Sequence, residues 1–137
     1  MAYSNFYARF YNIITKIKES FQAIFNIKSS LLYLIFIIFW QLAAWFQAWF
    51  IKNNLSGDFL VLHYNVDFGI DLVDSPAKIY LFPLFGLLIF LFNIILLACL
   101  HKNKNFKTLN HFLLGSSALF GVFLSIALVS VYLINFL

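Results

Sequence analysis

Long apolar runs alternate with short polar segments along this 137-residue chain, and three of the runs have the length of a membrane span. A spanning helix needs about 20 predominantly apolar residues. Residues 31–51, 79–100 and 109–136 meet this requirement, and these runs contain no Asp, Glu, Lys or Arg. The pattern predicts three transmembrane helices, with residues 52–78 forming the loop between the first two.

Residues 1–28 follow a different pattern, because their apolar side chains recur with the period of an α-helix. At about 100° per residue, these side chains form one stripe with polar and basic side chains opposite it. The stripe consists of Phe6, Phe10, Ile13, Ile14, Ile17, Phe21, Ile24 and Phe25, and the opposite face of Arg9, Asn12, Lys16, Glu19, Gln22 and Asn26. This pattern predicts an amphipathic helix in the cytoplasmic headgroup layer. The alternative is a helix that packs on a partner subunit or on the second loop.

The composition favours lipid as the solvent for much of the chain. Hydrophobic residues make up 64% and charged residues 10%, against roughly 45–50% and about 25% in a soluble domain. A core of this size cannot hide that excess. We therefore expect an all-α membrane protein, with an amphipathic interfacial helix over residues 1–28 and a three-span bundle over residues 29–137.

The distribution of positive charge predicts the orientation of the spans. Seven basic residues precede the first span or lie between the second and third, and two lie in the loop of residues 52–78. The seven are Arg9, Lys16, Lys18, Lys28, Lys102, Lys104 and Lys107, and the two are Lys52 and Lys78. We expect a cytoplasmic N-terminus and an extracytoplasmic C-terminus. The richness in Phe, Ile, Asn and Lys indicates a prokaryotic plasma membrane, although it does not separate bacterial from organellar membranes.

The net charge of +4 favours a bilayer with anionic headgroups as a partner, and not nucleic acid. The basic residues are not massed on one segment, and no nucleic-acid-binding motif is present.

The outer loop carries its own pattern of alternating side chains. In residues 59–66, β-branched and aromatic residues alternate with polar ones, which predicts a short extended or hairpin segment. Gly69 then indicates a turn. Asp74 or Ser75 followed by Pro76 is typical of a helix N-terminus. We expect the apolar side of the segment to rest on lipid or on the helix ends.

Small and amide side chains inside the spans predict helix packing. Ser117, Gly121 and Ser125 recur every four residues in the third span, and Ala44 and Ala48 do so in the first. Such spacing lets helix backbones approach closely, within one bundle or between copies. The amides Gln41 and Asn93 are expected to form interhelical hydrogen bonds, and the alternative is a polar pathway.

The chain shows little sign of catalytic chemistry. It has no recognisable nucleophile motif, phosphate-binding loop or HExxH sequence. His63 with Asp67, Asp71 and Asp74 matches no metal-ligand spacing, so we expect a solvated acidic loop, no metal and no cofactor. The one cysteine, Cys99, is expected to be buried and inert, and the alternative is reversible acylation.

Residues 62–93 resemble an uncharacterised bacterial membrane domain that also occurs at the N-terminal end of the immunity protein for the sporulation-delay toxin. The pattern is a His, an aromatic residue and Asn, followed by Gly, Asp, Lys and a Pro-containing transmembrane helix. The matching positions are His63, Tyr64, Asn65, Gly69, Asp71, Lys78 and Pro83. The resemblance implies that the loop and the second span form one structural unit, and it implies no reaction.

Two classes of function remain. The first is a non-enzymatic protein with an accessory, assembly or immunity-like role, acting through another membrane protein or itself. The second is a small oligomeric transporter or channel with a polar path through Gln41, Asn93 and Ser125. The absence of charged residues from the spans favours the first.

Overall fold

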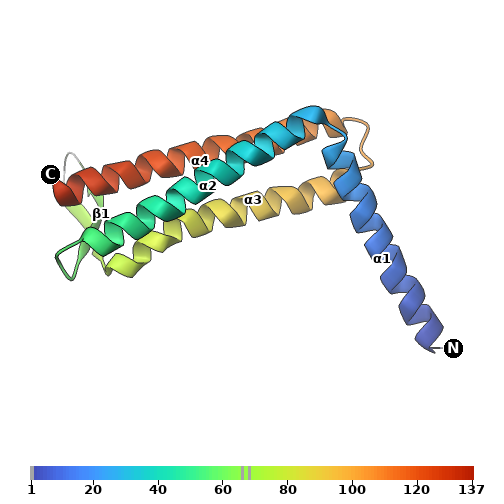
Figure 1. Cartoon of the computed structure of the whole chain (residues 1–137), viewed down its shortest axis with the longest axis horizontal. Coiled ribbons are helices and arrows are strands. Elements are labelled where there is room, and N and C mark those ends of the chain that lie inside the picture. Colours follow the sequence, from blue (N-terminus) through green and yellow to red (C-terminus); the bar gives the residue numbers. More distant parts are fainter. Residues whose placement is uncertain (1, 66, 68) are drawn as a thin grey trace.

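The described part of the chain forms four α-helices, a short 3-10 helix and a β-hairpin (Figure 1). The computed structural model describes residues 2–65, 67 and 69–137, without the side chains of residues 2–6, 8, 9, 64, 65 and 71. The elements are α1 (Ala2–Phe25), α2 (Lys28–Asn54), β1 (Leu60–Asn65), β2 (Gly69–Asp74), the 3-10 helix η1 (Pro76–Tyr80), α3 (Leu81–Leu100) and α4 (Phe106–Phe136).

Three helices are long and apolar enough to cross a membrane, as the sequence predicts. They span Lys28–Asn54, Pro76–Leu100 and Phe106–Phe136 in the part of the chain that is described. At about 1.5 Å per residue, even the shortest exceeds a hydrocarbon core of about 30 Å. These helices are compatible with an integral membrane protein.

The three long helices lie side by side, and α4 packs closely against both α2 and α3 (Figure 1). Two buried apolar clusters fill the bundle. One lies at the hairpin end and contains Leu60, Leu62, Ile79, Leu128 and Val131 with Ala44, Ala48 and Ile51. The other lies near α1 and contains Ile24, Ile37, Leu97, Leu114 and Ala118. The hairpin and the end of α1 therefore each contribute to the core.

Helix α1 leaves the bundle at a steep angle (Figure 1). The extended backbone of Ile27 separates α1 from α2. Near this elbow Ile24 is 1% exposed and Ser20 is 3% exposed, so the last turns of α1 are packed on the bundle. Farther toward the N-terminus, Phe10, Ile13, Ile14 and Ile17 are exposed. Of the predicted stripe, Ile24 is thus buried, whereas Phe21 and Phe25 on either side of it are exposed like the earlier members. The side chain of Phe6 lies outside the described residues.

Between α2 and α3, where the sequence predicts a short extended or hairpin segment, the chain forms an antiparallel strand pair. Strand β1 pairs with β2 in antiparallel register, with Leu60 opposite Asp74 and Asn65 opposite Gly69. The register is irregular around His63. Gly69 has a φ of +78°, a conformation that favours glycine, and this agrees with the predicted turn. Leu60 and Leu62 are buried, so the apolar side of β1 rests on the helix ends.

The helix that follows the hairpin begins as predicted at Pro76, which opens η1. Ser75 forms no side-chain cap bond. The Asp74 carboxylate accepts a hydrogen bond from the backbone N–H of Ser75, at 2.7 Å. The 3-10 turn then leads directly into α3.

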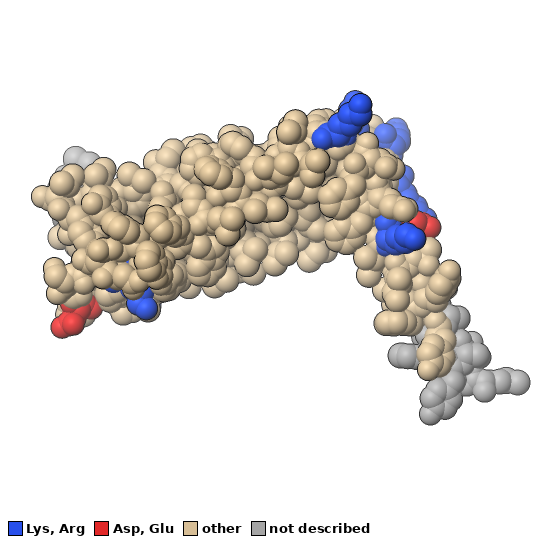
Figure 2. Space-filling model, viewed as in Figure 1, with Lys and Arg blue, Asp and Glu red and all other residues tan. Residues whose placement is uncertain are grey.

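Charged side chains gather at the two ends of the bundle (Figure 2). The end near the elbow carries Lys16, Lys18, Lys28, Lys102 and the single glutamate, Glu19. The hairpin end carries Asp74 and Lys78. Three apolar helices that lie side by side with charge at both ends are typical of chains that cross a bilayer.

Candidate functional site

The hairpin is fixed to the last turn of α4 by the side chain of Asn135. Its Oδ1 accepts a hydrogen bond from the backbone N–H of Val61 at 3.0 Å, and its Nδ2 donates to the Val61 carbonyl at 2.8 Å. Nδ2 also lies 2.8 Å from the Val131 carbonyl, one turn earlier in α4. The amide therefore pairs with β1 much as a neighbouring strand would.

Strand β2 carries exposed apolar side chains. Ile70, Leu72 and Val73 are 57%, 48% and 47% exposed. Two grooves, of about 410 and 460 Å³, border the hairpin, and both are lined by Leu62, Leu72 and Phe82. The hairpin end thus combines a fixed backbone with an exposed apolar surface, which is the usual character of an interaction site.

The motif residues whose side chains are described do not converge on one point. His63 is exposed and lines one of the grooves, while Tyr64 and Asn65 end β1 and Gly69 and Asp71 belong to β2. The side chains of Tyr64, Asn65 and Asp71 lie outside the described residues. Lys78 forms an ion pair with Asp74. Pro83 is buried in the first turn of α3, where its carbonyl accepts a hydrogen bond from Gln41.

The Lys78 ammonium group affects the titration of its partner. Its hydrogen bond to Asp74, and then the bond from the Ser75 N–H, hold the pKa of the Asp74 carboxyl below its usual value of 3.8. The ion pair is exposed and joins the end of β2 to η1. Among the described side chains, no group of three or more His, Cys, Asp or Glu is placed to hold a metal ion.

The two amides predicted within the spans are each bonded to a neighbouring helix. Gln41 donates to the Pro83 carbonyl at 2.6 Å. Asn93 donates to Ser117 Oγ at 2.8 Å and lies 3.1 Å from the Leu113 carbonyl. In α3 these two bonds are ten residues apart in sequence, or about 15 Å along the helix axis. They act as separate interhelical contacts, which is the packing role predicted for them.

The small residues that recur every four positions pack against other helices of the same chain. Ser117, Gly121 and Ser125 are all buried, and so are Ala44 and Ala48. A Cβ atom added to Gly121 would lie 3.1 Å from Cβ of Trp40, so α2 and α4 approach closely at this point. Of the two predicted uses of this spacing, the structure supports packing within one bundle.

Three polar contacts were not predicted from the sequence. Ser30 and Asn110 are fully buried and hydrogen-bonded to one another at 2.8 Å. Ser20 Oγ contacts His101 Nδ1, and Asn135 binds Val61. All of these residues lie at the edges of apolar runs, where polar residues are normally solvated. The available sequence signal was their position near the ends of helices, because the ends of neighbouring helices must pack against one another in a bundle.

Some buried polar atoms in the interior have no hydrogen-bond partner. Ser125 Oγ and Trp40 Nε1 lie on the facing helices α4 and α2, and Gln47 Oε1 lies farther along α2. A buried polar group without a partner is energetically costly. The packing of the helices therefore gives no reason for the burial of these atoms.

The prediction for the cysteine is wrong. Cys99 is exposed on α3 and lines a groove between α1 and α3. Leu97, two residues earlier, is buried against α2 and α4, so Cys99 lies on another face of the same helix.

The arrangement defines a small helical protein with three possible spans and a docked hairpin. Comparison of the chain with protein families, with characterised proteins and with solved structures found no match. The resemblance of residues 62–93 to the immunity-protein domain stays a prediction.

Proposed function

We propose that this protein is a non-enzymatic integral membrane protein that acts by binding another membrane protein, in an accessory, assembly or immunity-like role. The single observation that carries the proposal is the hairpin end, where a firmly held strand pair exposes Ile70, Leu72 and Val73. An exposed apolar surface on a fixed backbone binds with little loss of conformational entropy. The resemblance of residues 62–93 favours the immunity-like form of this role.

The charge distribution supports an orientation for this function. The lysines at the elbow end face the cytoplasm, and the hairpin and the C-terminus lie on the opposite side. The exposed apolar residues of α1, including Phe10 and Ile13, lie in the inner headgroup layer in this orientation. In this orientation the hairpin lies on the extracytoplasmic side, where it meets the partner protein.

The proposal is tested by capturing the tagged full-length protein from its own membranes in mild detergent, followed by mass spectrometry. We expect a foreign partner in stoichiometric amount. The variants Ile70→Thr and Val73→Thr retain β-branched side chains that suit a strand, and they should reduce capture. Ile126→Thr alters an equally exposed residue on α4, away from the hairpin, and should capture the partner normally.

A homo-oligomer without a foreign partner would contradict this proposal and favour a small transporter or channel. The observation that favours a transporter or channel is a set of buried polar atoms without hydrogen-bond partners, which are Ser125 Oγ, Trp40 Nε1 and Gln47 Oε1. Flux through reconstituted vesicles should then change in Ser125→Ala. The absence of any such change would contradict the transporter.

A further inference from the structure

Beside the elbow, the last turns of α1 pack against the C-terminal end of α3. Ser20 Oγ lies 3.1 Å from the Ala98 carbonyl and 3.1 Å from His101 Nδ1. His101 Nδ1 also lies 2.8 Å from the Ala98 carbonyl. Together with the buried Ile24, these contacts hold α1 against α3.

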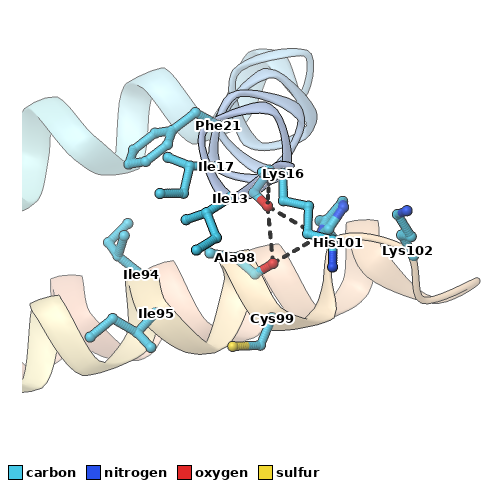
Figure 3. A pocket seen from close by; sticks show the side chains of 11 residues that line it. Ile13, Lys16, Ile17, Phe21, Ile94, Ile95, Ala98, Cys99, His101 and Lys102 are labelled. Carbon is cyan, nitrogen blue, oxygen red and sulfur yellow. Dashed lines mark hydrogen bonds between the residues drawn. The ribbon is translucent and has the colours of Figure 1, made fainter. Parts of the chain in front are cut away.

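An open groove of about 590 Å³ lies beside these contacts (Figure 3). One wall is formed by Ile13, Ile17 and Phe21 of α1, and the other by Ile94 and Ile95 of α3. Ile17 and Phe21 are 50% and 43% exposed, and Ile95 is 59% exposed. The walls are therefore apolar, and three of their side chains are exposed along the groove.

Positive charge lies at one side of this groove. Figure 3 shows Lys16 and Lys102 on the side where α3 ends, and Phe21, Ile94 and Ile95 on the other. The Glu19 carboxylate lies 4.0 Å from Lys102 Nζ. Both side chains of that pair are exposed, so the pair is weak and leaves the lysine able to bind another anion. The groove thus has apolar walls and two ammonium groups at one side. This arrangement is complementary to an amphiphile with an apolar chain and an anionic headgroup.

We propose that the elbow groove binds one anionic glycerophospholipid. An acyl chain lies along Ile17, Phe21 and Ile95, and the phosphate meets Lys16 and Lys102. This inference rests on the proposed membrane location, because an acyl chain is available to the groove only from the bilayer. It goes beyond general attraction of a basic protein to a membrane, since it assigns the headgroup and the chain to named side chains.

Lipid affinity is measured by native mass spectrometry of the purified full-length protein in detergent, with dioleoyl phosphatidylglycerol and dioleoyl phosphatidylcholine as probes. Their acyl chains are identical, so the comparison isolates the headgroup charge. We expect tighter binding of phosphatidylglycerol, weakened about fivefold by Lys16→Gln and by Lys102→Gln. The matched controls Lys18→Gln and Lys104→Gln remove lysines of the same regions that do not line the groove.

The acyl chain is tested separately. Ile17→Ser should weaken the binding of both lipids, whereas Ile14→Ser, an exposed residue of α1 outside the groove, should not. Cys99 lines the groove and is the one cysteine of the chain, so a fluorophore placed there reports on its occupant. Phosphatidylglycerol with brominated chains should quench it. Soluble glycerol 3-phosphate should not compete, because it has the headgroup phosphate without the chain.

Equal affinity for the two lipids would overturn the proposal, and so would equal weakening by the control lysine variants. Effective competition by glycerol 3-phosphate would show a free-phosphate site instead. A co-purified peptide that protects the Cys99 label would show that a protein segment fills the groove. Alkaline extraction distinguishes the two proposals: release of the protein from membranes would overturn the membrane role itself, whereas a retained protein without lipid preference would overturn the groove alone.

Discussion

Asn135, in the last turn of α4, forms hydrogen bonds with both backbone polar groups of Val61 in β1. The two residues are 74 positions apart in sequence. Together they connect the C-terminal end of the bundle to the hairpin, in addition to the apolar contacts of Leu60 and Leu62.

Asn135→Ala should loosen the hairpin from the bundle. It removes two bonds to Val61, each worth about 0.5–1.5 kcal/mol net, so we expect faster hydrogen exchange at the Val61 amide. Hydrogen-exchange mass spectrometry of the detergent-solubilised protein measures this. Asn54→Ala is the control, since Asn54 binds only within its own helix, to the Phe50 carbonyl. Unchanged exchange at Val61 in Asn135→Ala would show that the apolar contacts alone hold the hairpin.

Gly121→Ala should destabilise the bundle, whereas Gly115→Ala should not. An added Cβ at position 121 lies 3.1 Å from Trp40 Cβ, which moves only with the α2 backbone. Overpacking of this kind costs about 1–3 kcal/mol. At Gly115 the nearest atom is 3.9 Å away, so alanine fits and its better helix propensity favours it. Unfolding in mixed micelles compares the two, and equal stability would mean that α2 and α4 are not in close contact at this point.

Asn93→Leu should lower the stability of the contact between α3 and α4. The substitution removes the bond to Ser117, while Ser117 keeps its own bond to the Leu113 carbonyl at 3.0 Å. We expect a loss of about 0.6–2 kcal/mol in the free energy of unfolding. The same unfolding measurement applies, with Ser130→Ala as the control because Ser130 is exposed and bonded within α4. A loss no larger than that of the control would show that the interhelical bond contributes nothing.

Lys78→Met should raise the pKa of Asp74 toward its usual value of 3.8. In the native protein the folded pKa is lowered, so the stabilisation by the pair is present above the unfolded pKa. It is lost as the pH falls through the lower folded pKa. NMR titration of the Asp74 carboxyl carbon measures the shift. Lys52→Met is the control, since Lys52 lies over the ring of Tyr80. An unchanged Asp74 pKa in Lys78→Met would assign the lowering to the Ser75 N–H.

The proposed orientation predicts which cysteines are accessible from outside the cell. Cys99 is exposed in the structure at the elbow end of α3, so a membrane-impermeant maleimide should label it only after permeabilisation. Ser56, exposed between α2 and β1, should be labelled in intact cells as Ser56→Cys in a Cys99→Ala background. The opposite labelling pattern would reverse the orientation.

The sequence predicts the long helices well because lipid-length apolar runs are a strong signal. The hairpin and its turn at Gly69 are also predicted, from alternation and a single glycine. The roles of Gln41 and Asn93 follow from the cost of an unbonded amide in an apolar interior. In each case one local property of the chain is sufficient.

Contacts that depend on how helices are placed were not predictable in this way. The pairing of Asn110 with Ser30 requires the start of α4 to meet the start of α2, across 80 residues of sequence. Cys99 was expected to be buried, because an apolar helix does not reveal which of its faces lacks a neighbour. The burial of Ser20 and Ile24 likewise depends on where α1 meets α3, which the amphipathic pattern leaves open.

The joint at Ser20 and Ile24 also has a mechanical consequence. Because α1 is fixed to the bundle there, its angle to the three long helices cannot change without breaking buried contacts. Any surface on which α1 rests therefore sets the tilt of all three long helices at once. In the proposed membrane position of α1, any rotation of α1 would therefore move the hairpin sideways, by a distance that grows with the length of the bundle.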